Sequence, residues 1–230
     1  MWLDVGVVVA VLVATNLVAH FTTSLASLIS VPIAAVALIG IARHRGLGWH
    51  ELGLGREHWR SGAKYAAAAV VLVVAVIAIG AALPVTRSLF LNDRYATLST
   101  AVVSSMVIIP LQTVIPEELA FRGALHGTLS RALRFRWVAV SGSLLFGLWH
   151  VASSLGLTSG NAGLTKILGA GPWAQIAGIL GAVAATGAAG FVFTWLRKRS
   201  GSLIAPIALH WSLNGVGALA AALAWQMFVR

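Results

Sequence analysis

The stretch "IPEELAFRGALH", residues 115–126, puts three charged side chains into a part of the chain that is otherwise almost free of charge. Glu117 and Glu118 are adjacent, and Arg122 follows Glu118 by four residues. At this spacing Glu118 and Arg122 share one helix face and can form an ion pair. Glu117 lies about 100° around the helix and has no partner nearby in the sequence. The pattern predicts a supporting pair beside an unpaired carboxylate suited to general base chemistry.

The residue before these acids is Pro116, which removes one backbone N–H and favours a kink in the helix. Two further candidates are His150, in "LLFGLWHVASS", and His210, in "LIAPIALHWSLNG". Measured along their helices from the nearest basic flank, Glu117, His150 and His210 lie at depths of roughly 12 to 20 Å. Because these depths are similar, the three side chains are expected to share one site.

Asn214 follows His210 by four residues, so both side chains are expected on the same helix face. An imidazole and an amide placed together can donate hydrogen bonds to a developing oxyanion. Each could instead make an ordinary hydrogen bond between helices. The other histidines are expected in solvated or interfacial positions; they are His20, His44, His50, His58 and His126.

Composition indicates which solvent surrounds these residues. Of the 230 residues, 59% are hydrophobic and only 10% are charged, and the mean hydropathy is +0.90. Soluble domains usually contain about 25% charged residues. A lipid bilayer explains the composition, and the chain is long enough for roughly six to eight spans. There is no cysteine, which excludes disulfides and thiol catalysis.

The apolar segments predict an all-α fold, a polytopic transmembrane helix bundle with about seven transmembrane helices. We interpret it as a single membrane-embedded domain, 1–230, with amino-terminal spans in 1–96 and a motif-bearing catalytic core in 97–225. The opening segment lacks the basic region and cleavage site of a signal peptide, so we interpret it as the first span. The seven segments are 2–20, 25–42, 63–84, 97–126, 137–156, 173–196 and 203–225.

Lysine and arginine alternate between the loops. Twelve lie in the loops within 43–64, 122–136 and 197–199, and four lie in the intervening loops and at the carboxyl end. The positive-inside rule then predicts a cytoplasmic N-terminus and an external C-terminus. The basic residues form short clusters and no continuous stripe, so the net charge of +10 does not indicate nucleic acid binding.

Three short motifs occur in order on three separate predicted helices. "EELAFR" fits Glu-Glu-x-x-x-Arg, "FGLWH" fits Phe-x-x-x-His, and "HWSLN" fits His-x-x-x-Asn. Together they resemble the CAAX-protease and bacteriocin-processing family (CPBP, also called Abi) of intramembrane proteases, which includes CAAX prenyl protease 2-like enzymes. "FRG" (121–123) and "ELGLGR" (51–56) agree with this resemblance, whose motifs span about residues 110–220.

The resemblance implies that Glu117 and His150 activate a water molecule and that His210 and Asn214 stabilise the oxyanion. Glu118 and Arg122 would be the supporting pair. No cofactor is expected to be required. The alternative is a catalytic zinc held by Glu117, His150 and His210. Against zinc, each ligand would come from a different helix, and Asn214 beside His210 suits an oxyanion hole better than a zinc site.

Other functions remain open at this point. Buried Glu, His and Arg also serve transporters and proton relays, and a non-catalytic scaffold could retain the fold. A serine-type site using Ser141 or Ser143 with His150 is a further option. The expected partners are the lipid bilayer and a membrane-associated peptide or protein substrate. The expected location is the cell membrane, and the sequence does not indicate an oligomeric state.

Overall fold

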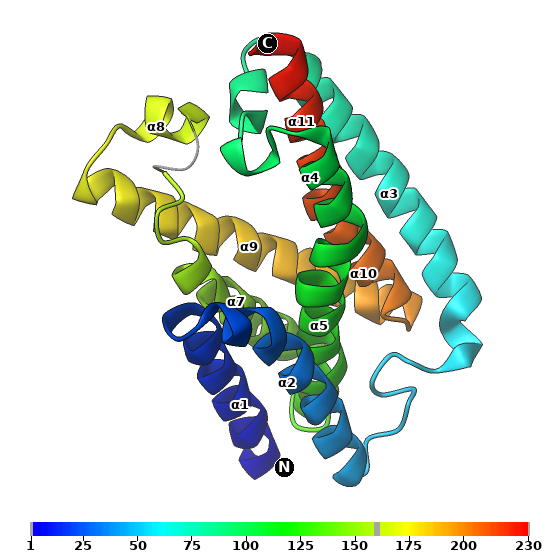
Figure 1. Ribbon diagram of the computed structural model, residues 1–230. Helices are drawn as coiled ribbons and strands as arrows, with labels where there is room; N and C mark the ends of the chain where they lie inside the picture. Colours follow the sequence, from blue (N-terminus) through cyan, green and yellow to red (C-terminus); the bar gives the residue numbers. More distant parts are fainter. Residues whose placement is uncertain (1, 159–161, 230) are drawn as a thin grey trace.

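The computed structural model describes residues 2–158 and 162–229, and within these ranges it contains helices and no strand. Figure 1 shows the helices packed side by side around a centre where α5, α7, α9 and α10 meet. The α-helices are α1 (Trp2–Phe21), α2 (Ser24–His44), α3 (Trp59–Ala82), α4 (Leu98–Val103), α5 (Ile115–Glu118), α6 (His126–Ser130), α7 (Phe135–Ser153), α8 (Ala162–Leu168), α9 (Pro172–Ser200), α10 (Ile204–Trp211) and α11 (Gly217–Phe228).

Several of these helices continue into one another through π-helical turns. The segments Ser104–Val114 and Leu119–Leu125 join α4, α5 and α6 into one long helix, and Ser212–Val216 joins α10 to α11. Short 3₁₀ turns occupy Arg56–His58, Arg87–Phe90 and Asp93–Tyr95. π-Helical turns are rare and frequently lie at functional sites.

The prediction of an all-α membrane bundle is confirmed. In the described part of the chain, six helices are long and apolar enough to cross a bilayer, and the protein is therefore an integral membrane protein. The predicted segment 137–156 forms α7, which is not among these six. Arg136, the serines and His150 lower the apolar content of α7.

Helix packing brings α7 and α9 into the closest association. A Cβ added at Gly147 of α7 would lie 2.7 Å from the Val183 carbonyl oxygen of α9, so only glycine allows this approach. Helix α1 packs along α2, and α10 packs against α3. The main apolar core includes Phe146, Trp149 and Phe193 and lies beside the long α4–α6 helix.

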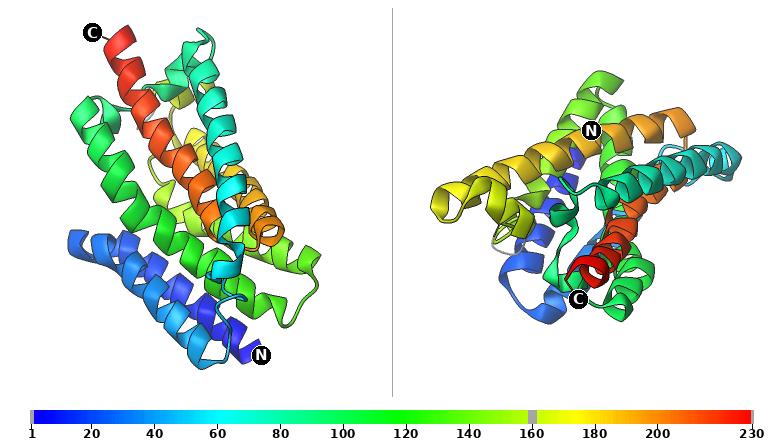
Figure 2. Two further views of the ribbon diagram at one scale, coloured as in Figure 1. Left: turned by 90° about the vertical axis from the view of Figure 1, so that its right-hand side faces the viewer. Right: turned by 90° about the horizontal axis from the view of Figure 1, so that it is seen from above.

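The two ends of the chain lie at opposite ends of the bundle (Figure 2), where α1 begins at one end and α11 finishes at the other. The seven predicted spans require this arrangement, with α7 as a crossing in addition to the six helices named above as long and apolar enough. Which end faces the cytoplasm stays a prediction from the distribution of lysine and arginine.

Candidate active site

The two adjacent acids lie on α5, between the π-helical segments Ser104–Val114 and Leu119–Leu125. Both side chains are buried: Glu117 is 6% exposed and Glu118 is fully buried. The backbone continues through Pro116 as part of the long α4–α6 helix. The π-helical turns on either side change the direction of neighbouring side chains relative to a regular α-helix.

The two oxygens of the Glu117 carboxylate differ in their hydrogen-bond partners. Its Oε1 accepts a hydrogen bond from the Trp149 indole N–H at 3.0 Å. Its Oε2 is buried and has no hydrogen-bond partner among the described residues. This second oxygen lies 4.0 Å from the Nε2 atom of His150. Helix α7 therefore supplies the hydrogen-bond partner that Glu117 lacks in its local sequence. The Oε2 atom of Glu117 stays available.

His150 is fixed by its own helix. Its Nδ1 donates to the carbonyl oxygen of Phe146 at 2.8 Å, one turn earlier on α7. The Phe146 ring also packs against the imidazole in a T-shaped arrangement, with ring centroids 4.7 Å apart. Because Nδ1 carries the proton in this bond, the Nε2 atom of a neutral His150 presents a lone pair toward Glu117.

Glu118 has different partners. Its Oε1 accepts a hydrogen bond from Arg122 at 3.1 Å and another from the Nδ1 atom of His210 at 2.9 Å. Arg122 is 1% exposed and also donates to the carbonyl oxygen of Gly190 on α9 at 3.2 Å. Glu118 therefore links α5 to α10 and compensates the buried arginine.

Aromatic rings complete this arrangement. The Arg122 guanidinium lies 4.0 Å from the centroid of the Phe146 ring and 4.9 Å from that of Phe193, both within cation–π range. Phe193 also stacks on the His210 imidazole, with centroids 5.0 Å apart and the planes 22° from parallel. The ring of His210 is thus held by Glu118 at one edge and Phe193 on one face.

A cavity of about 670 Å³ lies against these residues. Glu117, His150, His210 and Asn214 all line it, and Glu118 and Arg122 do not. Other lining residues come from α1, α2 and α9, so six helical regions enclose the space. The four residues that sequence reasoning predicted as catalytic thus meet at one cavity, while the supporting pair lies behind its wall.

Asn214 differs from the other three in exposure. It is exposed, whereas His210 is 4% exposed. The expectation of one shared helix face assumed α-helical spacing, but the chain is π-helical from Ser212 to Val216. Asn214 lines the cavity and makes no side-chain hydrogen bond within the described ranges.

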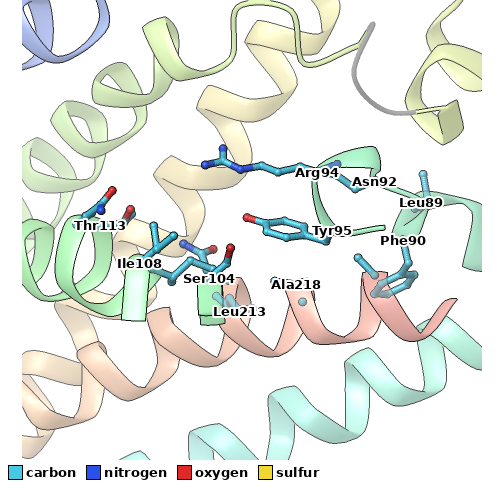
Figure 3. Close-up of a pocket in the computed structure, with 15 residues that line it drawn as sticks. Leu89, Phe90, Asn92, Arg94, Tyr95, Ser104, Ile108, Thr113, Leu213 and Ala218 are labelled. Carbon is cyan, nitrogen blue, oxygen red and sulfur yellow. The ribbon is translucent and has the colours of Figure 1, made fainter. Parts of the chain in front are cut away.

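A neighbouring cavity of about 440 Å³ adjoins this site and shares four wall residues with it. These four are Gln112, Thr113, Leu213 and Asn214. Figure 3 shows Arg94 and Tyr95 extending from the loop before α4 toward the helix that carries Thr113. The site therefore borders a second hollow that contains polar groups from another part of the chain.

Sequence reasoning missed Trp149 and Gly190, which bond to Glu117 and Arg122 from other helices. Only the position of Trp149 directly before His150 signalled its role. The serine alternative receives no support from the geometry, because neither Ser141 nor Ser143 lines the site cavity. His20, expected at the membrane edge, does line it.

The donor set of the zinc alternative fits a metal in one respect. His150 gives its Nδ1–H to a backbone carbonyl and His210 gives its own to a carboxylate, as zinc-bound histidines commonly do. In another respect it does not fit. Among the described residues, Glu117, His150 and His210 do not form a group whose ligand atoms all lie within 4.8 Å of one another.

Comparison with known proteins gives one informative match. No curated protein and no solved structure matches the chain. A family model described as type II CAAX prenyl endopeptidase Rce1-like matches residues 99–216, just over half of the chain. The matched range begins in α4 and includes the four predicted catalytic residues and the supporting pair, which are Glu117, His150, His210, Asn214, Glu118 and Arg122. The family indicates a protease, which favours that interpretation over a transporter or a scaffold. The chain belongs to the Rce1-like family of type II CAAX prenyl endopeptidases.

Proposed function

We propose that the protein is an intramembrane endopeptidase that hydrolyses a peptide bond of a membrane-associated substrate in the 670 Å³ cavity. The observation that carries this proposal is the 4.0 Å separation between Oε2 of Glu117 and Nε2 of His150. Both atoms accept hydrogen bonds when Glu117 is ionised and His150 is neutral. They are too far apart to bond directly, and a single water with arms of about 2.8 Å would span roughly this gap.

In the proposed reaction, Glu117 and His150 orient a water molecule and take its proton as its oxygen attacks the carbonyl carbon. The carbonyl π electrons move onto oxygen, which becomes the oxyanion of a tetrahedral intermediate. The proton is then passed to the leaving nitrogen as the C–N bond breaks. The products are a carboxyl group on one fragment and an amine on the other.

Trp149 supports this role of Glu117. Its indole N–H stabilises the ionised carboxylate through Oε1 and fixes the direction of Oε2. A base that is held in position avoids reorganisation when charge moves in the transition state.

The oxyanion would be stabilised by His210 and Asn214. The Nδ1 atom of His210 already donates to Glu118, so Nε2 can donate only if the ring carries a positive charge. Asn214 has an uncommitted amide on the same cavity wall, and an amide N–H₂ is a suitable second donor.

Water can be supplied from the neighbouring 440 Å³ cavity in this scheme. Asn214, Gln112 and Thr113 line both hollows, so a polar wall connects them. We place the N-terminus in the cytoplasm and the protein in the cell membrane, on the basis of the basic loops. We also propose that catalysis needs no metal, because the three candidate ligands are not gathered closely enough to share one.

The test is a comparison of membrane-peptide profiles between cells that express the wild-type protein and cells that express Glu117→Gln. We expect intact substrates to accumulate with the variant and to be cleaved when purified wild-type protein in proteoliposomes is added. Equal profiles and equal cleavage by both proteins would refute the assignment of Glu117. Glu57→Gln is the matched control, because Glu57 is exposed and lies far along the sequence from the site.

A further inference from the structure

A separate cavity of about 420 Å³ lies where three basic segments of the sequence converge. It is formed by the loop between α2 and α3, the end of α6, and the end of α9. Its lysine and arginine residues are Arg131, Arg197, Lys198 and Arg199, and we call it the basic pocket. None of these residues belongs to the proposed active site.

Two groups in the basic pocket are buried more deeply than membrane topology requires. Arg197 is 6% exposed and His126 is 8% exposed. The Nε atom of Arg197 and the Nδ1 atom of His126 have no hydrogen-bond partner among the described residues. The positive-inside rule needs cations only on the cytoplasmic side, where solvated side chains suffice. Burying a cation and an imidazole beside a cavity therefore calls for a local ligand.

The charge balance of the pocket shows which kind of ligand fits. Its one lining acid is Glu51, and Arg131 already holds both oxygens of that carboxylate at 2.8 and 2.9 Å. Arg197, Lys198 and Arg199 form no ion pair within the described ranges. Three cations thus face one cavity without compensation. A phosphate group, with several acceptor oxygens and negative charge, complements them.

Arg197 also shapes the wall. Its Nη2 donates to the carbonyl oxygens of His50 and Glu51 at 3.2 and 3.0 Å, which holds the loop against the end of α9. Gly53 permits this contact, since a Cβ there would lie 2.2 Å from Nε of Arg197. The site is therefore built from ordered groups on two elements and is more than a cluster of mobile surface cations.

The level of the pocket in the membrane indicates the source of the phosphate. Trp49, Trp59 and Trp137 lie on the neighbouring segments and are about half exposed. An arginine lies over each of these rings, at 4.5 Å for Trp49, 5.7 Å for Trp59 and 5.5 Å for Trp137. Exposed tryptophans beside arginines are typical of the headgroup layer of a bilayer. We propose that the basic pocket binds the phosphate headgroup of an anionic lipid.

A metal ion is the competing ligand at this end of the bundle. The ligand atoms of His50, Glu57 and His58 lie within 4.8 Å of one another, and both histidines line the pocket. Repulsion from Lys198 and Arg199 disfavours a divalent cation there and favours an anion. The two ligands depend on different residues, so variants distinguish them.

The experiment measures lipid-dependent thermal stability and native mass spectra of the purified full-length protein. The lipids are phosphatidic acid, phosphatidylglycerol and phosphatidylcholine in nanodiscs. We expect the two anionic lipids to bind and stabilise the wild type. The double variant Lys198→Gln, Arg199→Gln should bind them roughly thirtyfold more weakly, since each of the two lost cations contributes about 1 kcal/mol near an anionic membrane surface. Both positions are exposed, so the variant should fold.

The matched control is Arg134→Gln, Arg136→Gln, which removes the same charge from exposed positions outside the pocket. This control should retain lipid binding. Equal loss in both double variants would overturn the proposal, because it would show only a general attraction to anionic surfaces.

Two further arms test the identity of the ligand. Inorganic phosphate that protects the wild type as well as the lipids do would overturn a lipid source. Zinc binding that depends on His50 and His58, without any lipid effect of Lys198→Gln, Arg199→Gln, would overturn an anion site. None of these readouts depends on proteolysis.

Discussion

Glu117 and Glu118 are neighbours in the chain with nearly equal burial, yet the fold gives them different environments. Both oxygens of Glu117 face α7, one bonded to Trp149 and the other left without a partner at the cavity wall. Glu118 faces α10 and the interior, where Arg122 and His210 share one of its oxygens. A rotation of about 100° between adjacent residues separates the two roles.

The difference shows how a membrane protein can place a reactive carboxylate beside a structural one. An ion pair with Arg122 would occupy the oxygens of the Glu117 carboxylate, so that neither could hold a water molecule. The α-helical spacing instead commits Arg122 to Glu118. His210 then extends that structural pair to the cavity, since its Nδ1 touches Glu118 while its ring lines the site.

The largest expected effect comes from replacing Glu117 or the two histidines that line its cavity. Glu117→Gln, His150→Ala and His210→Ala should each lower proteolysis by at least about 10²- to 10⁴-fold, the usual contribution of a general acid or base. Folding should survive in Glu117→Gln, which keeps the size of the side chain, and in His150→Ala, because His150 is partly exposed. Activity in proteoliposomes and size-exclusion profiles measure the two properties. Normal turnover by Glu117→Gln would remove Glu117 from the mechanism.

The next largest effect comes from breaking the buried ion pair between Glu118 and Arg122. Arg122→Ala leaves Glu118 as an uncompensated buried charge, and breaking such a pair costs about 3–5 kcal/mol. We expect a lower folded yield and a lower thermal unfolding midpoint, with Arg136→Ala as the exposed control. The double variant Glu118→Gln, Arg122→Gln should recover part of that yield while remaining inactive. Arg122→Ala with wild-type stability would show that the pair does not hold the fold.

Trp149 tests whether Glu117 needs a fixed orientation. Trp149→Phe keeps an aromatic ring against Phe121 but deletes the hydrogen bond to Oε1. A hydrogen bond to a charged group contributes about 1.5–3 kcal/mol, so turnover should fall roughly 10- to 100-fold. Trp137→Phe, an exposed tryptophan on the same helix, is the control. Equal turnover by Trp149→Phe and Trp137→Phe would show that Glu117 keeps its orientation without the hydrogen bond from Trp149.

Much of this arrangement could be predicted from the sequence, for a physical reason. Apolar runs of about 20 residues indicate which segments lie in the bilayer. The seven predicted segments coincide with helices within a few residues. Spacing within one helix also allowed the contact between Glu118 and Arg122 to be predicted. Both depend on local geometry alone.

Other features depend on contacts between distant parts of the chain. Trp149 of α7 donates a hydrogen bond to Glu117 of α5. The carbonyl oxygen of Gly190, on α9, accepts a hydrogen bond from Arg122. The burial of His126 was missed because a position near a helix end normally indicates an interface. The π-helical turn around Asn214 has no local sequence signal, so its exposure could not be anticipated.

A smaller effect is expected at the loop that borders the basic pocket. Hydrogen bonds from Arg131, and then from the N–H of Gly48, lower the pKa of Glu51 below its usual value of 4.5. The stability from this contact is therefore present above that value and is lost as the pH falls through the lower pKa of the folded protein. The pair is more than a third exposed, so Glu51→Gln should cost only about 0.2–1 kcal/mol at pH 7.

Thermal unfolding at a series of pH values measures this effect. The difference in unfolding midpoint between the wild type and Glu51→Gln should shrink as the medium is acidified below pH 4.5. Glu57→Gln is the control from the same loop. A difference that grows on acidification would mean that folding raises the pKa of Glu51 instead of lowering it.

The smallest expected effect is that of metal removal, which should leave turnover unchanged. Glu117 and His150 face each other across 4.0 Å, and His210 is not drawn to the same point. Bound zinc would draw its three ligands to roughly 2.0–2.2 Å from the metal.

Elemental analysis alone could mislead, because His50, Glu57 and His58 offer a second, exposed set of ligands. The measurement should therefore use the double variant His50→Gln, His58→Gln, which keeps the active site intact. Chelator-washed variant protein should contain no stoichiometric metal and should cleave substrate at its unwashed rate. Zinc that remains at nearly one equivalent in this variant, and whose removal and return switch proteolysis off and on, would show that Glu117 is a ligand and not the base.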